Sequence, residues 1–319
     1  MLGLILTIVS GTSKAIATEL IATIPLTGVK GRIDHLSADP ARHRIFIAAL
    51  GNDTVEIIDT QSKERRTISG LREPQGVAYL PDSDRLFIAN GGGDRVDVVD
   101  VASLSVLRRI GDMADADNLR YDVAARKIWV GYGRGALRML DAASGESVDA
   151  ISLPGHPESF QLERSGSRIF VNVPNARKVI VVDRLRRKIV GQWDTPDASA
   201  NFPMALDEQG HRLFVGTRSP PELLVYDTES GNVTARLAIA KDTDDLFFDP
   251  EHARVYVVCG DGKVNVFRRE APDRYAMVET IETAPRARTG LLVPEEGRLY
   301  VAAPAVGKTS ARILVYRVP

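Results

Sequence analysis

One five-residue pattern recurs seven times along this chain of 319 residues. Each copy opens with a basic residue and continues through β-branched and aromatic side chains. The copies are RIFIA from Arg44, RLFIA from Arg85, KIWVG from Lys127, RIFVN from Arg168, RLFVG from Arg212, RVYVV from Arg254 and RLYVA from Arg298. Subtracting successive start positions gives intervals of 41, 42, 41, 44, 42 and 44 residues. A period of this length is typical of propeller blades and of helical arrays.

A second apolar run follows each copy and favours strands over helices. These runs are VEIID (55–59), VDVVD (96–100), LRMLD (137–141), VIVVD (179–183), LLVYD (223–227), VNVFR (264–268) and ILVYR (313–317). Short runs of β-branched residues separated by Gly, Asn and Asp turns, with no helical period, predict strands.

The repeat divides into four expected strands, A to D. Strand A precedes the motif, as in QGVAYL (75–80), strand B is the motif, strand C is the second run, and strand D follows a turn, as in SVLRRI (105–110). The seventh C run has no D strand after it, and ELIATIPL (19–26) is left unassigned at the other end. If residues 19–26 supply the missing outer strand of the seventh blade, the open edge of that blade is covered and the ring closes. We therefore predict a single domain, residues 18–319, that folds as a seven-bladed β-propeller with four-stranded antiparallel blades, closed by the N-terminal strand on the last blade.

Two repeats carry a family resemblance. RIFIAALGNDTVEIID (44–59) and RLFIANGGGDRVDVVD (85–100) resemble repeats of the YVTN, or YncE-like, β-propeller family. The resemblance implies an often exported bacterial protein of a group in which many members have no assigned biochemical role. Related seven-bladed propellers include surface-layer proteins, a lactonase and DNA-binding examples, and no motif in this sequence selects one of them.

The N-terminus differs from the repeats. Residues 2–9 are apolar, and Ala15-Ile16-Ala17 has the small-x-small form of a signal-peptidase site. We expect a signal peptide over residues 1–17, a mature chain from Thr18 without a transmembrane segment, and a periplasmic or secreted location. No Lys or Arg precedes the apolar run, so a mis-assigned start codon or a disordered leader stays open as an alternative.

Composition excludes several functions. The formal net charge is −1 and no long block of like charge occurs, so nucleic acid is not an expected partner. Cys259 is the only cysteine, which excludes an intrachain disulfide and a thiolate metal cluster, and we interpret it as a buried structural thiol. No G-x-S-x-G context supports a catalytic triad. We expect a monomer.

The repeated polar and aromatic residues are interpreted as scaffold. Strand C ends in Asp59, Asp100, Asp141, Asp183 and Asp227, where a carboxylate accepts backbone N–H groups of the following turn. The basic residues that open strand B are expected to form local ion pairs. Its aromatic residues, such as Phe46 and Trp129, are expected to pack between blades.

The positions where repeats differ are better candidates for function. Ten residues before each strand-B basic residue stand Asp34, Gln75, Asp117, Glu158, Phe202, Asp244 and Arg288, and the next positions include His35, Asn118 and Asp245. In a propeller the starts of the A strands surround one mouth of the central channel, and different polar groups converging there are typical of a small-molecule site. The predicted ligand-binding residues are Asp34, His35, Gln75, Asp117, Asn118, Glu158, Asp244, Asp245 and Arg288. A structural alternative is that Arg288 neutralises Asp244 and Asp34.

Two of these carboxylates suggest a metal. Asp117 and Glu158 lie on adjacent predicted blades, and with Asn118 and with His35 across the opening they could hold a hard cation such as Ca²⁺. The favoured hypothesis is an exported scaffold that binds a small molecule or a partner protein at the channel mouth, with no catalysis assumed. The alternative is a metal-assisted hydrolase resembling a lactonase, with Glu158 or Asp117 as the base. A redox accessory protein without its own cofactor is a third hypothesis.

Overall fold

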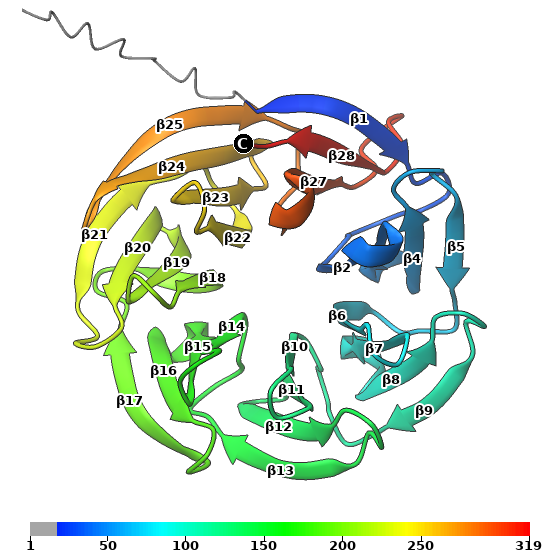
Figure 1. The fold of residues 1–319 in the computed structure, drawn as a ribbon, viewed down its shortest axis with the longest axis horizontal. Helices are drawn as coiled ribbons and strands as arrows, with labels where there is room; N and C mark the ends of the chain where they lie inside the picture. The colour runs from blue at the N-terminus through cyan, green and yellow to red at the C-terminus, as the bar shows by residue number, and fades with distance from the viewer. Residues whose placement is uncertain (1–17) are drawn as a thin grey trace, which may run out of the picture.

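The computed structural model describes residues 18–319, which form twenty-eight strands arranged as seven sheets around a central channel (Figure 1). The predicted signal peptide lies outside the described residues. In the first three sheets the strands are β2 (Leu36–Asp39), β3 (Arg44–Ala49), β4 (Thr54–Asp59) and β5 (Arg65–Ile68); β6 (Pro74–Leu80), β7 (Arg85–Asn90), β8 (Arg95–Asp100) and β9 (Val106–Ile110); and β10 (Leu119–Asp122), β11 (Lys127–Tyr132), β12 (Ala136–Asp141) and β13 (Ser147–Ser152).

The remaining four sheets repeat the same order, inner strand first. They are β14 (Phe160–Leu162), β15 (Arg168–Val173), β16 (Lys178–Asp183) and β17 (Lys188–Asp194); β18 (Ser199–Asp207), β19 (Arg212–Ser219), β20 (Pro221–Asp227) and β21 (Val233–Ala238); β22 (Thr243–Asp249), β23 (Arg254–Cys259), β24 (Lys263–Ala271) and β25 (Arg274–Glu282); and β26 (Thr289–Val293), β27 (Arg298–Ala303), β28 (Arg312–Arg317) and β1 (Glu19–Pro25). Single-turn 3-10 helices occupy Pro40–Arg42, Leu50–Asn52, Gly91–Gly93, Pro174–Ala176 and Pro294–Glu296. No helix in residues 18–319 has the length and apolar character needed to span a membrane.

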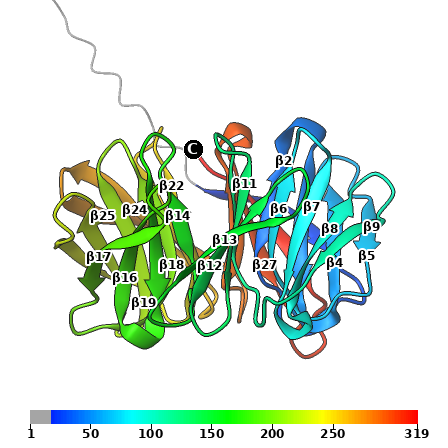
Figure 2. The same ribbon diagram turned by 90° about the horizontal axis from the view of Figure 1, so that it is seen from below.

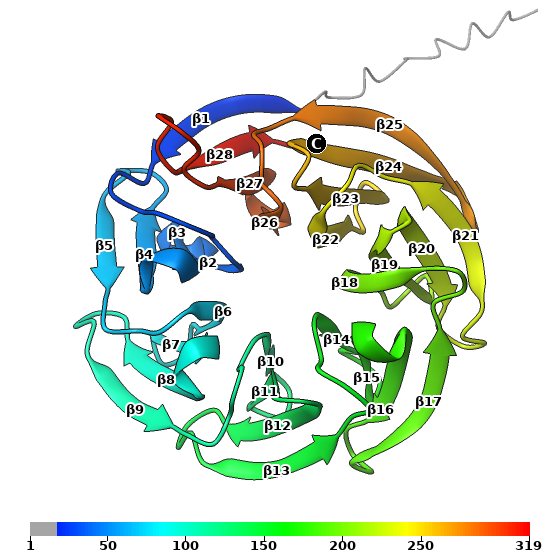
Figure 3. The ribbon, with the colours of Figure 1, turned by 180° about the vertical axis from the view of Figure 1, so that it is seen from behind.

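The ring closes as predicted. β1 runs antiparallel to β28, with Ile24 opposite Ile313, so both ends of the described chain share the last sheet (Figures 1 and 3). The backbone N–H of Leu26 extends the pairing by donating to the carbonyl of Ala311. β1 thus covers the outer edge of β28 and gives the last sheet the same four strands as the other six.

The core lies between the blades, which stand side by side around the channel in Figure 2. The strand-B aromatic residue of each blade packs against the next blade: Phe46 lies in one buried cluster with Leu86 and Ile88, and Tyr300 lies with Ile45 and Ile47 across the seam. These rings are at most 2% exposed. The predicted packing between blades is confirmed, and it follows from alternation, since every second residue of a strand faces the same neighbouring sheet.

The scaffold interpretation is confirmed for the strand-C aspartates and for four of the seven strand-B basic residues. Ion pairs are formed by Arg44, Lys127, Arg168 and Arg212, whereas within residues 18–319 none is formed by Arg85, Arg254 or Arg298. Asp59 Oδ1 accepts the backbone N–H groups of Gln61 and Ser62 at 2.9 and 2.7 Å, and the other strand-C aspartates fix their turns in the same way. Arg44 pairs with Asp39 within its own blade and with Asp84 of the next blade, both at 2.6 Å. These groups stabilise turns and blade contacts and are not available for a ligand.

Candidate functional site

The loops that lead into the inner strands are anchored alike in successive blades. The N–H of Asp117 donates to the carbonyl of Gly131, and the N–H of Glu158 donates to that of Asn172, both at 3.0 Å. These bonds tie each A-strand start to the end of its strand B, so that equivalent positions meet at one mouth of the channel, as the sequence predicts.

The mouth contains a cavity of about 180 Å³. Its lining includes Gln75, Asp117, Glu158, Asp244 and Arg288 from the predicted set, together with Arg32, Asp115, His156, Phe202 and Arg218. His35 and Asn118 line a smaller adjoining hollow. Asp34 is fully buried, and Asp245 lies behind His35, where its carboxylate accepts hydrogen bonds instead of facing the cavity.

On one side of the cavity, arginines and carboxylates neutralise one another. Asp244 accepts contacts from Arg218 at 2.6 Å and from Arg288 at 2.9 Å. Arg32 Nη2 lies 2.9 Å from Asp34 and 3.7 Å from Asp244. Arg288 therefore pairs with Asp244, as the structural alternative expects, but the partner of Asp34 is Arg32.

The burial of these acids has an electrostatic cost. Burial raises the pKa of Asp34 to about 6, although the positive charges of His35 and Arg32 act against the increase. Burial also raises the pKa of Asp244, against the lowering effect of Arg218 and Arg288. Desolvation of a carboxylate disfavours its charged form, so nearby arginines are needed to keep these acids ionised.

His35 belongs to a separate hydrogen-bond network. Its Nδ1 lies 3.2 Å from Asp245 Oδ1, and its Nε2 lies 3.1 Å from Asn118 Nδ2. Burial opposes a charge on the ring, but Asp245 and Asp34 outweigh it and raise the pKa of His35 to about 10. The amide nitrogen of Asn118 faces Nε2 and suits a neutral ring, while its Oδ1 accepts a hydrogen bond from Arg120 Nη1 at 3.0 Å; a charged ring would require the amide to turn and to give up that bond. Both ring nitrogens are engaged, and His35 is not free to bind an ion.

The other side of the cavity brings together Asp117, His156 and Glu158. One donor atom from each residue lies within 4.8 Å of the other two. His156 Nδ1 lies 2.6 Å from the carbonyl of Gly133, while Nε2 lies 3.8 Å from Asp117 Oδ2. Within residues 18–319 no basic side chain lies within ion-pair distance of Glu158. For Asp117, His156 is the only such side chain in the same range.

The pKa values of the three groups reflect this crowding. Burial and the charge of Asp117 raise the pKa of Glu158 to about 8. Burial opposes protonation of His156, but Asp117 and the Gly133 carbonyl raise its pKa to about 9. Burial acts to raise the pKa of Asp117, yet His156 and His35 hold it below its ordinary value. Glu158 therefore tends to keep its proton near neutral pH, while His156 is the local counter-charge of Asp117 and also lies 3.6 Å from Asp115 Oδ2.

The repeat alignment did not identify several residues that line the cavity, although most of them share one register in the sequence. Arg32, Asp115, His156 and Asp242 each stand two residues before an aligned mouth position, and the same register holds Glu73 and Arg286. This register is as polar and as variable between blades as the predicted one. Arg218 comes from the end of β19, and the repeat gave no reason to single it out.

A glycine in the neighbouring blade makes room for the Asp117 loop. A Cβ added at Gly76 would lie 2.2 Å from the Asp117 carbonyl oxygen and 3.2 Å from Asn118 Cα. Any other residue at position 76 would have to displace this backbone. The close approach of two blades at Gly76 therefore helps to set the position of Asp117.

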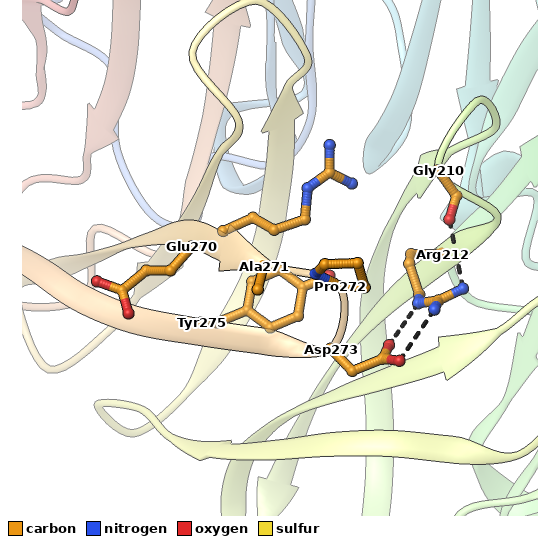
Figure 4. Close-up of a pocket in the computed structure, with 8 residues that line it drawn as sticks. Gly210, Arg212, Glu270, Ala271, Pro272, Asp273 and Tyr275 are labelled. Atoms are coloured by element: carbon orange, nitrogen blue, oxygen red, sulfur yellow. Dashed lines mark hydrogen bonds and ion pairs between the residues drawn. The ribbon is translucent and has the colours of Figure 1, made fainter.

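A second hollow, of about 390 Å³, lies beside the turn between β24 and β25 (Figure 4). Figure 4 shows Arg212 beside Asp273, and two contacts of 2.6 and 3.1 Å join them. Arg212 also pairs with Asp227, and Arg269 pairs with Asp207. Both arginines are occupied by carboxylates and hold neighbouring blades together. This hollow is therefore a weaker candidate for a ligand site than the channel mouth.

Comparisons with known proteins agree with this architecture. No protein-family profile matches the sequence. The chain is 26% identical over 189 residues to "Uncharacterized protein YncE" of Salmonella typhimurium and of Salmonella typhi, a match that covers 57% of this chain and 52% of each relative. The match thus spans about half the length of these curated relatives.

Solved structures show the same fold at low sequence identity. A chain of Kuenenia stuttgartiensis hydrazine synthase gives a TM-score of 0.76 at 17% identity, covering 86% of this chain and 94% of that one. A chain of the mitotic checkpoint complex gives 0.79 at 15% identity, covering 100% of this chain and 99% of that one. At these identities the likeness shows the fold alone. Over 57% of its length the chain is a distant homologue of YncE, and it is built as a seven-bladed β-propeller.

Proposed function

We propose that this protein is an exported β-propeller that binds a small polar ligand, or a polar group of a partner protein, at the channel mouth without catalysing a reaction. One observation carries the proposal. Asp117 and Glu158 border a cavity of about 180 Å³, and Glu158 has no basic partner within ion-pair distance among the described residues. A carboxyl group held at a cavity without a basic partner offers oxygen acceptors that a ligand can use.

The charges of the mouth restrict the chemistry of the ligand. Arg288 and Arg218 are occupied by Asp242 and Asp244, so they are poor anchors for an anion. The available acceptors favour a ligand with hydroxyl, ammonium or other N–H donors. The ring of Phe202, stacked under the Arg218 guanidinium at 4.1 Å from the ring centroid, adds an apolar surface.

A ligand screen in the presence of EDTA tests this proposal independently of metals. The full chain would be heated with amine-rich and hydroxyl-rich metabolites, and a true ligand raises the melting temperature as its concentration rises. The shift should disappear in Glu158→Gln and persist in Glu19→Gln, a matched change of a glutamate that is 62% exposed on β1. No shift with any compound, or equal shifts in both variants, would contradict the proposal.

A metal-assisted hydrolase, of lactonase type, is the second candidate. The observation that favours it is the grouping of Asp117, His156 and Glu158 around a cavity with space for a substrate. Turnover of a panel of lactones and esters by metal-loaded protein, lost in Glu158→Gln with the fold intact, would support this function. No turnover by the metal-loaded chain would rule it out for those substrates.

Export and a monomeric state are parts of the same proposal. Export is supported by the apolar run at residues 2–9 and by Ala15-Ile16-Ala17. Cell fractionation with N-terminal sequencing should find Thr18 as the first residue of a periplasmic or secreted protein. Light scattering after size-exclusion chromatography should give the mass of one chain.

A further inference from the structure

We infer that Asp117, His156 and Glu158 hold one first-row divalent cation such as Zn²⁺ or Mn²⁺, in preference to Ca²⁺. The inference rests on the proposed binding function of the mouth and names the cation that would occupy it. It also changes the ligand set expected from the sequence, because the histidine is His156 and not His35.

The spacing of the three side chains is compatible with one shared ion. Bonds of about 2.0–2.2 Å place the donors of a tetrahedral zinc site roughly 3.4 Å apart. The donors here lie within 4.8 Å of one another, and His156 Nε2 is 3.8 Å from Asp117 Oδ2. Small side-chain rotations close the remaining difference. Asp117 and Glu158 come from equivalent loops of adjacent blades, so rigid sheets hold them in place.

The hydrogen bond of His156 leaves the correct nitrogen free. Its Nδ1 donates to the carbonyl of Gly133 at 2.6 Å, which directs Nε2 toward the two carboxylates. Histidines that bind metals commonly donate their second ring N–H to a carbonyl or carboxylate, which fixes the tautomer and the ring orientation. His35 lacks this property, because Asp245 and Asn118 occupy both of its nitrogens.

The carboxylate of Asp117 is buried, and no group of the described residues makes a hydrogen bond to it. Its side chain is 7% exposed, and within residues 18–319 its only ion-pair contact is His156 at 3.8 Å. A buried carboxylate whose counter-charge lies at 3.8 Å is only partly compensated, and a second carboxyl group beside it adds to the cost. The arginines across the cavity do not remove this charge, because Asp34, Asp242 and Asp244 hold them. A divalent cation would neutralise both carboxylates.

The chemistry of the donors selects the class of metal. Ca²⁺ takes six to eight oxygen ligands, whereas imidazole suits Zn²⁺ and other first-row ions. One imidazole and two carboxylates provide three protein ligands. The adjoining cavity leaves room for water or a ligand at further positions, which is the arrangement of an open metal site.

Calorimetric titration of the full chain, stripped of metal by EDTA and then dialysed, tests the inference. Zn²⁺, Co²⁺, Mn²⁺ and Ca²⁺ are titrated separately, and the visible spectrum of the Co²⁺ form reports its coordination. We expect one ion per chain. Zn²⁺ and Co²⁺ should bind more tightly than Mn²⁺, and Ca²⁺ should bind most weakly of the four. His156→Gln, Asp117→Asn and Glu158→Gln should each weaken Zn²⁺ binding by at least about tenfold.

A matched histidine controls for adventitious binding. His211 has a side chain that is 60% exposed beside Glu229, and His211→Gln should leave the affinity unchanged. Metal-free Glu158→Gln should melt at or above the temperature of the wild type, because one of two neighbouring carboxylates is removed, while losing the stabilisation by Zn²⁺.

Three outcomes would overturn the assignment. They are no binding of any of these ions, unchanged Zn²⁺ binding in His156→Gln, and a preference for Ca²⁺. None of them affects ligand binding measured in EDTA, so failure of the metal site is distinguishable from failure of the proposed function.

Discussion

The seam of the ring offers the sharpest test of how this fold holds together. Leu26 follows β1, is fully buried, and lies in a cluster with Ala311 and Ile313 of the last blade and Ile45 of the first. Leu26→Ala removes these contacts, and truncations of this kind in well-packed cores cost about 2–5 kcal/mol. A domain has only about 5–15 kcal/mol of stability, so the loss should be large.

Urea unfolding followed by circular dichroism and by tryptophan fluorescence measures the effect. Trp129 in β11 and Trp193 in β17 lie on the opposite side of the ring from β1 (Figure 1). If closure stabilises the whole ring, both probes should shift to the same lower midpoint. Leu20→Ala is the matched control, because Leu20 is on β1 but 51% exposed, and it should change stability by no more than about 0.5 kcal/mol. Equal effects of the two substitutions, or a shift seen by only one probe, would refute the reasoning.

Three further predictions concern charged and reactive groups. Asp34→Asn should become increasingly stabilising as pH rises from about 4 to 6 and then level off, because folding raises the pKa of Asp34 to about 6 and so penalises its ionised form. The gain in free energy of unfolding should reach about 3 kcal/mol in urea unfolding at several pH values. A pH-independent difference between the two proteins would contradict this expectation. Asp227→Ala should cost about 1–2 kcal/mol in thermal unfolding, because Oδ1 accepts the N–H groups of Glu229 and Ser230 while Oδ2 pairs with Arg212; a neutral effect would show that the turn does not need its cap. Cys259 should not react with Ellman's reagent until the protein unfolds, since burial raises the pKa of its thiol to about 12, and rapid labelling of the native protein would disprove that burial.

The fold was predictable because its determinants are local and repeated. Strand B copies such as RLFIA at Arg85 specify an alternating buried strand, and their spacing specifies a blade. The unpaired run at residues 19–26 could be assigned to the last blade by elimination, and the structure pairs β1 with β28. The turn role of Asp59 was predictable for the same reason, since its partners are two and three residues away.

The site was only partly predictable, because its contacts join blades that are distant in sequence. Asp117 and Glu158 were identified from their aligned positions, whereas His156 stands two residues before an aligned position and was not among the predicted residues. The orientation of His156 depends on Gly133 in the preceding blade, and no local pattern contains that hydrogen bond. The pairing of Arg218 with Asp244 likewise depends on where β19 ends relative to β22.

Alternation and period are properties of the chain itself, and they determined the strands, the number of blades and the closure. Tertiary structure decided which charges are neutralised and which are left free. Arg32, Arg218 and Arg288 converge on Asp34, Asp242 and Asp244, so among the described residues Asp117 is left with His156 as its ion-pair partner and Glu158 with none. The physical reason is that the energy of a charge depends on distance and burial, and both are fixed only when seven separate segments meet at one channel mouth.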